Sequence, residues 1–132
     1  MTIVVDSSAM VAALVDGGPD GAWARAGLAG QELVAPSHLY VEVSNVLRRS
    51  VLSGRLAQEA AALAHHDLVR APVTAFPFEP LAARVWELHP SVTSYDGAFV
   101  ALAEELDAPL WTLDRKLAAA SGPRCSFRLP DR

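Results

Sequence analysis

The stretch Ser94–Glu104, SYDGAFVALAE, decides the fold, because it predicts a buried helix that begins beside an acid. Asp96 lies in the first turn, where free backbone N–H groups and the positive end of the helix dipole favour a carboxylate. Apolar residues follow at spacings of three and four, as in a helix with a buried face; they are Phe99, Val100, Leu102, Ala103 and Leu106. The stretch therefore predicts a firmly packed helix that holds one carboxylate at its beginning.

Strands and helices are predicted to alternate on both sides of this helix. Short apolar runs predict strands at residues 3–5, 32–35, 73–76, 110–113 and 126–129. Helical patterns occur at residues 9–14, 20–29, 37–52, 55–69, 80–88 and 114–120. We expect Ser37 to cap the third of these helices and Leu63 to lie on the buried face of the fourth. Such alternation predicts an α/β domain with a mostly parallel sheet flanked by helices.

The composition indicates a globular protein. The chain has 132 residues, of which 52% are hydrophobic and 20% charged, so we expect a single domain over residues 1–132 with a real core. The formal net charge of −4 argues against binding to nucleic acid by bulk charge alone. It leaves nucleic-acid chemistry open, because divalent cations can invert the local field of an acidic site.

The chain has features of a cytoplasmic protein. Cys125 is the single cysteine, which excludes an internal disulfide framework and fits a reducing compartment. The beginning, MTIVVD, has no basic leader, and no apolar run approaches the roughly 20 residues that a membrane-spanning helix needs. We therefore expect a cytoplasmic location and no membrane partner.

Four acids are candidates for one site, and each is joined to a strongly apolar element. Asp6 and Asp114 end predicted strands, Asp96 opens a helix, and Glu42 projects from a helix face. Ligands of parallel sheets bind beyond the carboxyl ends of strands. Hard cations such as Mg²⁺ or Mn²⁺ prefer oxygen ligands, whereas clustered carboxylates without a cation repel one another. Singly, the three aspartates could equally be helix caps, so the combination carries the interpretation.

Four segments in order resemble the PIN domain, and more narrowly the VapC toxins of bacterial toxin–antitoxin pairs. The segments are Val4–Ser8 (VVDSS), Glu42–Arg49 (EVSNVLRR), Tyr95–Ala103 (YDGAFVALA) and Thr112–Leu117 (TLDRKL). The resemblance covers essentially the whole chain. It implies a parallel sheet flanked by helices and an endoribonuclease that depends on Mg²⁺ or Mn²⁺.

The resemblance also implies roles for individual residues. Asp6, Glu42, Asp96 and Asp114 match the four family acids, with Asp6 and Asp96 as the most direct metal ligands and the other two completing the site or acting through water. Thr112 and Asn45 match supporting polar positions, and Gly97 stands where alanine is commoner. Apart from the resemblance, a hydrolytic mechanism would let the nearby arginines Arg49, Arg115 and Arg48 hold flanking phosphates, although each could equally be a solvated surface residue.

The implied partners are an RNA substrate, either transfer RNA or ribosomal RNA, a second copy of the chain, and a small antitoxin whose C-terminal arm covers the acidic cleft. The apolar helices between residues 37 and 69 leave room for self-association. His38, His65, His66 and His89 share no ligand spacing on one face, so we expect no zinc site.

Two other readings remain open from the sequence. One is a receiver-like binding module with an acidic pocket, although Asp6 has no acidic neighbour and the only lysine, Lys116, lies in a predicted helix. The other is a PIN-like scaffold that binds RNA or protein without cutting.

Overall fold

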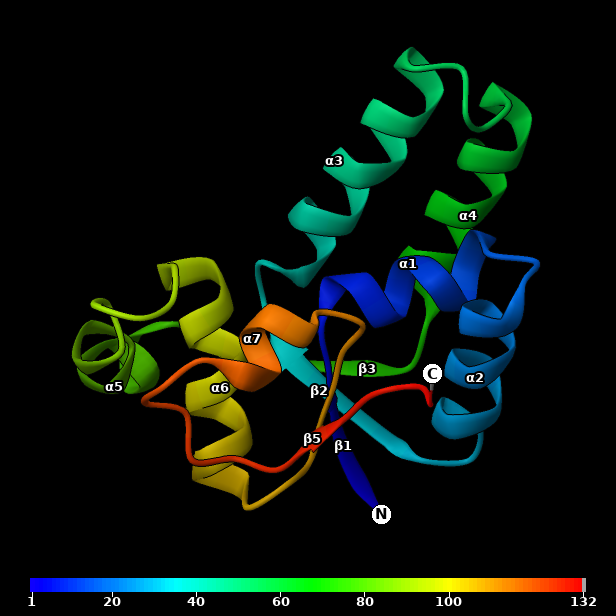
Figure 1. Cartoon of the computed structure of the whole chain (residues 1–132). Coiled ribbons are helices and arrows are strands. Elements are labelled where there is room, and N and C mark those ends of the chain that lie inside the picture. The colour runs from blue at the N-terminus through cyan, green and yellow to red at the C-terminus, as the bar shows by residue number, and fades with distance from the viewer. Residues whose placement is uncertain (132) are drawn as a thin grey trace.

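A sheet of five strands, all parallel, runs through the centre of the protein in the order β3-β2-β1-β4-β5 (Figure 1). The computed structural model describes residues 1–131, so Arg132, the last residue of the expected domain, lies outside it. The strands are β1 (Thr2–Val5), β2 (Glu32–Pro36), β3 (Val73–Phe76), β4 (Leu110–Trp111) and β5 (Phe127–Arg128). All five lie where apolar runs predict them, and the last two are shorter than expected.

Helices cover the sheet and confirm the α/β architecture. They are α1 (Ser7–Val15), α2 (Pro19–Leu28), α3 (Leu39–Leu52), α4 (Gln58–Arg70), the 3₁₀ turn η1 (Glu79–Leu81), α5 (Ala82–Glu87), α6 (Ser94–Leu106) and α7 (Arg115–Ala119). Helix α6 packs against β1, β2 and β4, while α1 packs against α2, α3 and α4.

Helix α6 is more deeply buried than its sequence pattern predicts. Every residue from Gly97 to Ala103 is buried, whereas Leu106, expected on the apolar face, is 37% exposed near the end of the helix. The reason is that α6 lies between the sheet and α5, so both sides of its middle turns are covered. Its first turn, with Asp96, is thereby fixed by the core.

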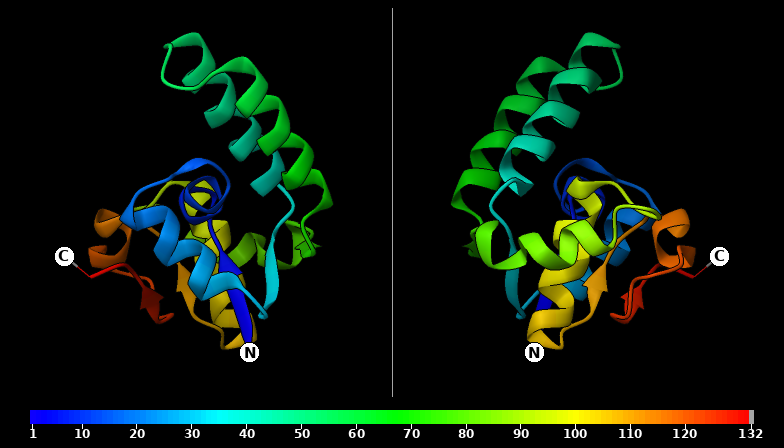
Figure 2. Two further views of the ribbon diagram at one scale, coloured as in Figure 1. Left: turned by 90° about the vertical axis from the view of Figure 1, so that its right-hand side faces the viewer. Right: turned by 90° about the vertical axis from the view of Figure 1, so that its left-hand side faces the viewer.

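Helices α3 and α4 form a hairpin that projects from the body of the protein (Figure 2). Two expectations for this hairpin are wrong. Ser37 does not cap α3: the cap position is His38, and its side chain makes no capping hydrogen bond. Leu63 is 63% exposed, because α4 begins at Gln58 and turns a face of small residues inward, ending at Leu68.

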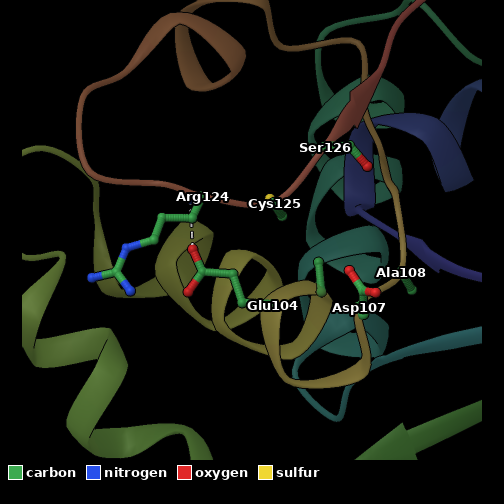
Figure 3. Close-up of a pocket in the computed structure, with 7 residues that line it drawn as sticks. Glu104, Asp107, Ala108, Arg124, Cys125 and Ser126 are labelled. Atoms are coloured by element: carbon green, nitrogen blue, oxygen red, sulfur yellow. Dashed lines mark hydrogen bonds between the residues drawn. The ribbon is translucent and has the colours of Figure 1, made fainter.

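An ion pair ties α6 to α5 and to the C-terminal segment. Glu104 accepts a hydrogen bond from Arg84 Nε at 2.7 Å. It accepts a second one from the backbone N–H of Arg124 at 2.7 Å (Figure 3). Partial burial alone would raise the pKa of Glu104, but these hydrogen bonds outweigh burial and lower it. Glu104, Arg124 and Cys125 line one cavity of about 420 Å³. Burial raises the pKa of the Cys125 thiol to about 11, so the thiol stays protonated at neutral pH.

Across residues 1–131, no helix combines the length and apolar character that crossing a bilayer requires.

Two helical glycines predict opposite effects of the same substitution. A Cβ on Gly27 would lie 1.9 Å from the Trp111 ring, which stacks on Trp23, whereas a Cβ on Gly97 would lie 3.5 Å from its nearest neighbour, Val85. We expect Gly27→Ala to destabilise the protein by about 1–3 kcal/mol through overpacking. Gly97→Ala should stabilise it by about 0.5–1 kcal/mol, because alanine is the better helix former. Urea denaturation of both variants tests this, and equal effects would contradict the tight packing of Gly27.

Candidate active site

The candidate site lies at the ends of the neighbouring strands β1 and β4, from which the chain continues to opposite sides of the sheet. From β1 the chain continues to β2 on one side, and β4 continues to β5 on the other. Pairing of Val5 with Trp111 brings the ends of β1 and β4 together, and the N–H of Asp6 donates to the Trp111 carbonyl at 3.1 Å. Such a switch point is where ligands bind in open α/β sheets.

Asp6 is the most buried acid of the site, with 5% of its surface exposed. It caps α1: its Oδ1 accepts hydrogen bonds from the Ala9 N–H at 3.0 Å and from Ser8 Oγ at 2.7 Å. Its Oδ2 accepts a hydrogen bond from the hydroxyl of Thr112, which is fully buried. Asp6 is therefore held in one orientation by elements from both ends of the chain.

Burial raises the pKa of Asp6 from 3.8 to about 6. Hydrogen bonds from Thr112, Ala9 and Ser8 favour the charged form and oppose this rise, whereas the carboxylate of Asp96 adds to it by repulsion. The negative charge on Asp6 is thus destabilised at neutral pH, which makes this carboxylate a natural partner for a cation.

Asp96 is half-buried in the first turn of α6 and is the electrostatic centre of the four acids. Thr93 caps this helix, accepting a hydrogen bond from the Asp96 N–H at 3.2 Å. Burial raises the pKa of Asp96, and repulsion from Asp114 and Glu42 raises it further. Since Asp96 also repels Asp6, it senses each of the other three acids.

Glu42 joins the site through the beginning of α1. Its Oε1 accepts a hydrogen bond from Ser7 Oγ at 2.6 Å and lies 3.6 Å from His38 Nε2, one turn earlier in α3. The helix hairpin is thereby tied to the residue that follows Asp6.

Asp114 is exposed and caps α7, accepting a hydrogen bond from the Leu117 N–H at 3.0 Å. Its own N–H donates to Thr112 Oγ1 at 3.0 Å. A cavity of about 260 Å³ between α6 and α7 is lined by Asp96, Asp114 and Lys116. Thr112 therefore connects the first and the fourth acid, and a lysine faces the same space as the third and the fourth.

All four acids occupy this one edge of the sheet, but they do not form a closed ligand cage. Among residues 1–131, no three His, Cys, Asp or Glu side chains are placed to hold a metal ion together. Mg²⁺ needs no such cage, because it keeps several waters and is commonly bound by one or two carboxylates. The hard oxygen donors of Asp6 and Asp96, which repel each other, fit such a cation.

Several residues of the site were not singled out from the sequence. Ser7 and Ser8 hold Glu42 and Asp6, and their signal was their place directly after the first acid, where hydroxyls at a helix start can reach neighbouring carboxylates. The signal for His38 was its position four residues before Glu42. Lys116 had no signal beyond its nearness to Asp114.

Of the expected supporting residues, Thr112 is in place, whereas Asn45 is exposed on α3. Arg115 donates a hydrogen bond to the Pro130 carbonyl and so anchors the C-terminal segment.

Comparisons with known proteins agree with this geometry. Residues 3–123 match the family described as PIN domain. Ribonuclease VapC1 of Mycobacterium tuberculosis is 40% identical over 127 residues, covering 96% of both chains. Ribonuclease VapC12 of the same species is 34% identical over 127 residues, covering 96% of this chain and 98% of its own.

A solved structure shares the fold at lower identity. The crystal structure of VapC20 from Mycobacterium tuberculosis, a toxin that cleaves the sarcin–ricin loop, matches with a TM-score of 0.69 at 19% identity, covering 89% of this chain and 93% of that one. The extent of the PIN match and the identity to two VapC ribonucleases decide the family: this chain belongs to the PIN-domain proteins and, among them, to the VapC ribonucleases.

Proposed function

We propose that this chain is a Mg²⁺- or Mn²⁺-dependent endoribonuclease that hydrolyses RNA phosphodiester bonds, acting as the toxin of a toxin–antitoxin pair. The observation that supports it most is the pair of repelling carboxylates at the switch point, with the pKa of buried Asp6 raised to about 6 beside Asp96. Membership of the PIN family removes the receiver-like reading, and the non-cleaving scaffold becomes an outcome of the cleavage assay below.

In this proposal Asp6 and Asp96 hold the cation directly, while Glu42 and Asp114 act through water. A cation held there would lower the pKa of a bound water molecule and stabilise negative charge on a phosphate. The chain contributes orientation: Thr112 and Ser8 fix Asp6, and Ser7 fixes Glu42.

Lys116 is the side chain that we propose holds the RNA backbone. It lines the cavity that also contains Asp96 and Asp114, so its ammonium can contact a phosphate next to the bond that is cut. Arg49 lines a second cavity, of about 330 Å³, along α3 and can hold a more distant phosphate. Arg115, bound to the Pro130 carbonyl, is less suited to this task than the sequence suggested.

The partners in this proposal are transfer RNA or ribosomal RNA, a second copy of the chain, and an antitoxin whose C-terminal arm covers the acidic edge. Exposed apolar side chains on the projecting α3–α4 hairpin support an association surface; they are Val41, Leu52, Leu63 and Val69. We place this activity in the cytoplasm, where both RNA substrates occur.

Asp96→Asn tests the proposed chemistry. The substitution removes a charge that repels the other three acids and a proposed metal ligand, so we expect metal-dependent cleavage to fall by about 100-fold or more, beyond the loss typical of residues behind metal ligands. Cleavage of total transfer RNA and ribosomal RNA is measured with Mg²⁺, with Mn²⁺ and with EDTA. Asp107→Asn is the matched control, because Asp107 lies at the opposite end of the same helix in a left-handed conformation that asparagine tolerates.

Undiminished cutting by Asp96→Asn would contradict its assignment. A parent protein that binds RNA but leaves it intact with Mn²⁺ would favour the non-cleaving scaffold instead.

The same variant tests whether a cation relieves repulsion at the site. In EDTA we expect Asp96→Asn to melt at a higher temperature than the parent, because one of the repelling charges is gone. Added Mg²⁺ should then raise the melting temperature of the parent more than that of the variant. Thermal unfolding with and without Mg²⁺ measures both effects, and equal Mg²⁺ responses would argue against Asp96 as a ligand.

Asp6 predicts a specific pH dependence of stability without metal. Its pKa is higher in the folded protein than in the unfolded chain, so the folded state binds the proton more tightly between these values. The free energy of unfolding should therefore fall as the pH rises from 4 to 6, by about 2 kcal/mol more in the parent than in Asp6→Asn. Urea denaturation in EDTA across this range measures the difference, and parallel pH profiles would show that Asp6 is not destabilised by burial.

A further inference from the structure

A different cavity, of about 290 Å³, lies beside the acidic edge, at the beginnings of α3 and α6. Its volume is at the small end of the range for ligand pockets. Three rings contribute to its wall, those of His38, Phe78 and Tyr95, together with the small residues Ser37 and Ser94. None of the four acids lines it, so it is distinct from the proposed metal site.

Two of these rings are unusually exposed. Tyr95 is 65% exposed and Phe78 is 49% exposed, although both come from elements anchored in the core. The neighbours of Tyr95 in α6 are buried from Gly97 onward, so its backbone is held firmly while its ring faces the cavity. Exposed aromatic rings on a firmly held backbone are suitable platforms on which unpaired bases stack.

His38 connects this cavity to the acids. Its Nε2 lies 3.0 Å from the Tyr95 carbonyl and 3.6 Å from Glu42 Oε1. The centroid of its ring lies 4.9 Å from the ring centroid of Phe99, which is in the core, and 6.2 Å from that of Tyr95. The imidazole is thus fixed between the core, the acidic edge and the cavity, and Tyr95 is the residue directly before Asp96.

We propose that this cavity binds one unpaired nucleobase of the RNA substrate, from a nucleotide adjacent to the phosphodiester at the acids. The proposal rests on the proposed function and names its base-binding subsite. A phosphate near Asp96 carries its neighbouring base past Tyr95, where the ring of Tyr95 or Phe78 can stack on it. The Ser37 and Ser94 hydroxyls can donate to or accept from the base edge.

A neutral, flat occupant suits this place better than an acidic one. The wall is mostly apolar, and the carboxylate of Glu42 lies just behind His38, so an acidic peptide side chain would be repelled. A nucleobase carries no charge, stacks on aromatic faces and tolerates a nearby carboxylate. The cavity is therefore a candidate source of sequence preference for cleavage in single-stranded loops.

The test compares two single-stranded RNA probes of eight nucleotides with the same backbone. One carries all its bases in mixed sequence, and the other carries abasic sites throughout. Fluorescence anisotropy measures both affinities in EDTA, which prevents metal-dependent cutting of the probes. Repulsion between the four acids and the RNA phosphates affects both probes equally, so it cancels in the ratio of the two affinities. We expect the parent to prefer the probe with bases by about tenfold or more, as one stacked base provides.

Tyr95→Ala should remove most of this preference while leaving the affinity for the abasic probe unchanged, and Tyr95→Phe should retain it. Trp86→Ala is the matched control, since Trp86 is a 69% exposed aromatic residue outside the cavity lining. A full preference in Tyr95→Ala would overturn the proposal and leave the cavity to another occupant, such as an antitoxin side chain.

The same proteins are assayed for RNA cleavage with Mn²⁺. A parent that cuts RNA but shows no base preference overturns the subsite alone. A parent that neither binds nor cuts RNA overturns the proposed function as well.

Discussion

The hydrogen bond from Thr112 to Asp6 is the interaction on which the site depends. It joins the ends of β1 and β4, two strands that are far apart in the sequence and adjacent in the sheet. Parallel pairing puts both strand ends at one edge, and the turn after each strand delivers a side chain there. Because Thr112 also accepts a hydrogen bond from the Asp114 N–H, one buried hydroxyl sets the position of two acids.

That hydroxyl also explains how a buried carboxylate is tolerated. Asp6 has three hydrogen-bond donors, so its oxygens are satisfied even though water is largely excluded. Burial nevertheless dominates and raises its pKa. An acid that is well oriented but poorly neutralised is suited to binding a cation, since a cation supplies the charge that the protein withholds.

The sequence was sufficient for the sheet and for the grouping of the acids, because these follow from apolar runs and from residues that end strands. It was insufficient where the tertiary surroundings decide. Leu63 repeats at helical spacing, yet it is exposed, because α4 packs through its alanines on a projecting hairpin. The spacing of His38 and Glu42 is a local signal for their contact, but no local pattern reveals that His38 also reaches the Tyr95 carbonyl in α6.

The three aspartates differ in whether the carboxylate also caps a helix. Asp6 and Asp114 accept hydrogen bonds from the free N–H groups of α1 and α7, so their interpretation as helix caps is correct. Both aspartates also lie at the same edge of the sheet. Replacing either therefore changes a helix start and the charge of the site together. Asp96 is different, because Thr93 caps α6 and no capping role falls to the Asp96 carboxylate. The N-terminal end of α6 favours the half-buried Asp96 carboxylate, but burial and repulsion by the other acids outweigh this and raise its pKa. A cation would relieve this repulsion, which is the strongest physical argument for the proposal that this edge of the sheet binds one.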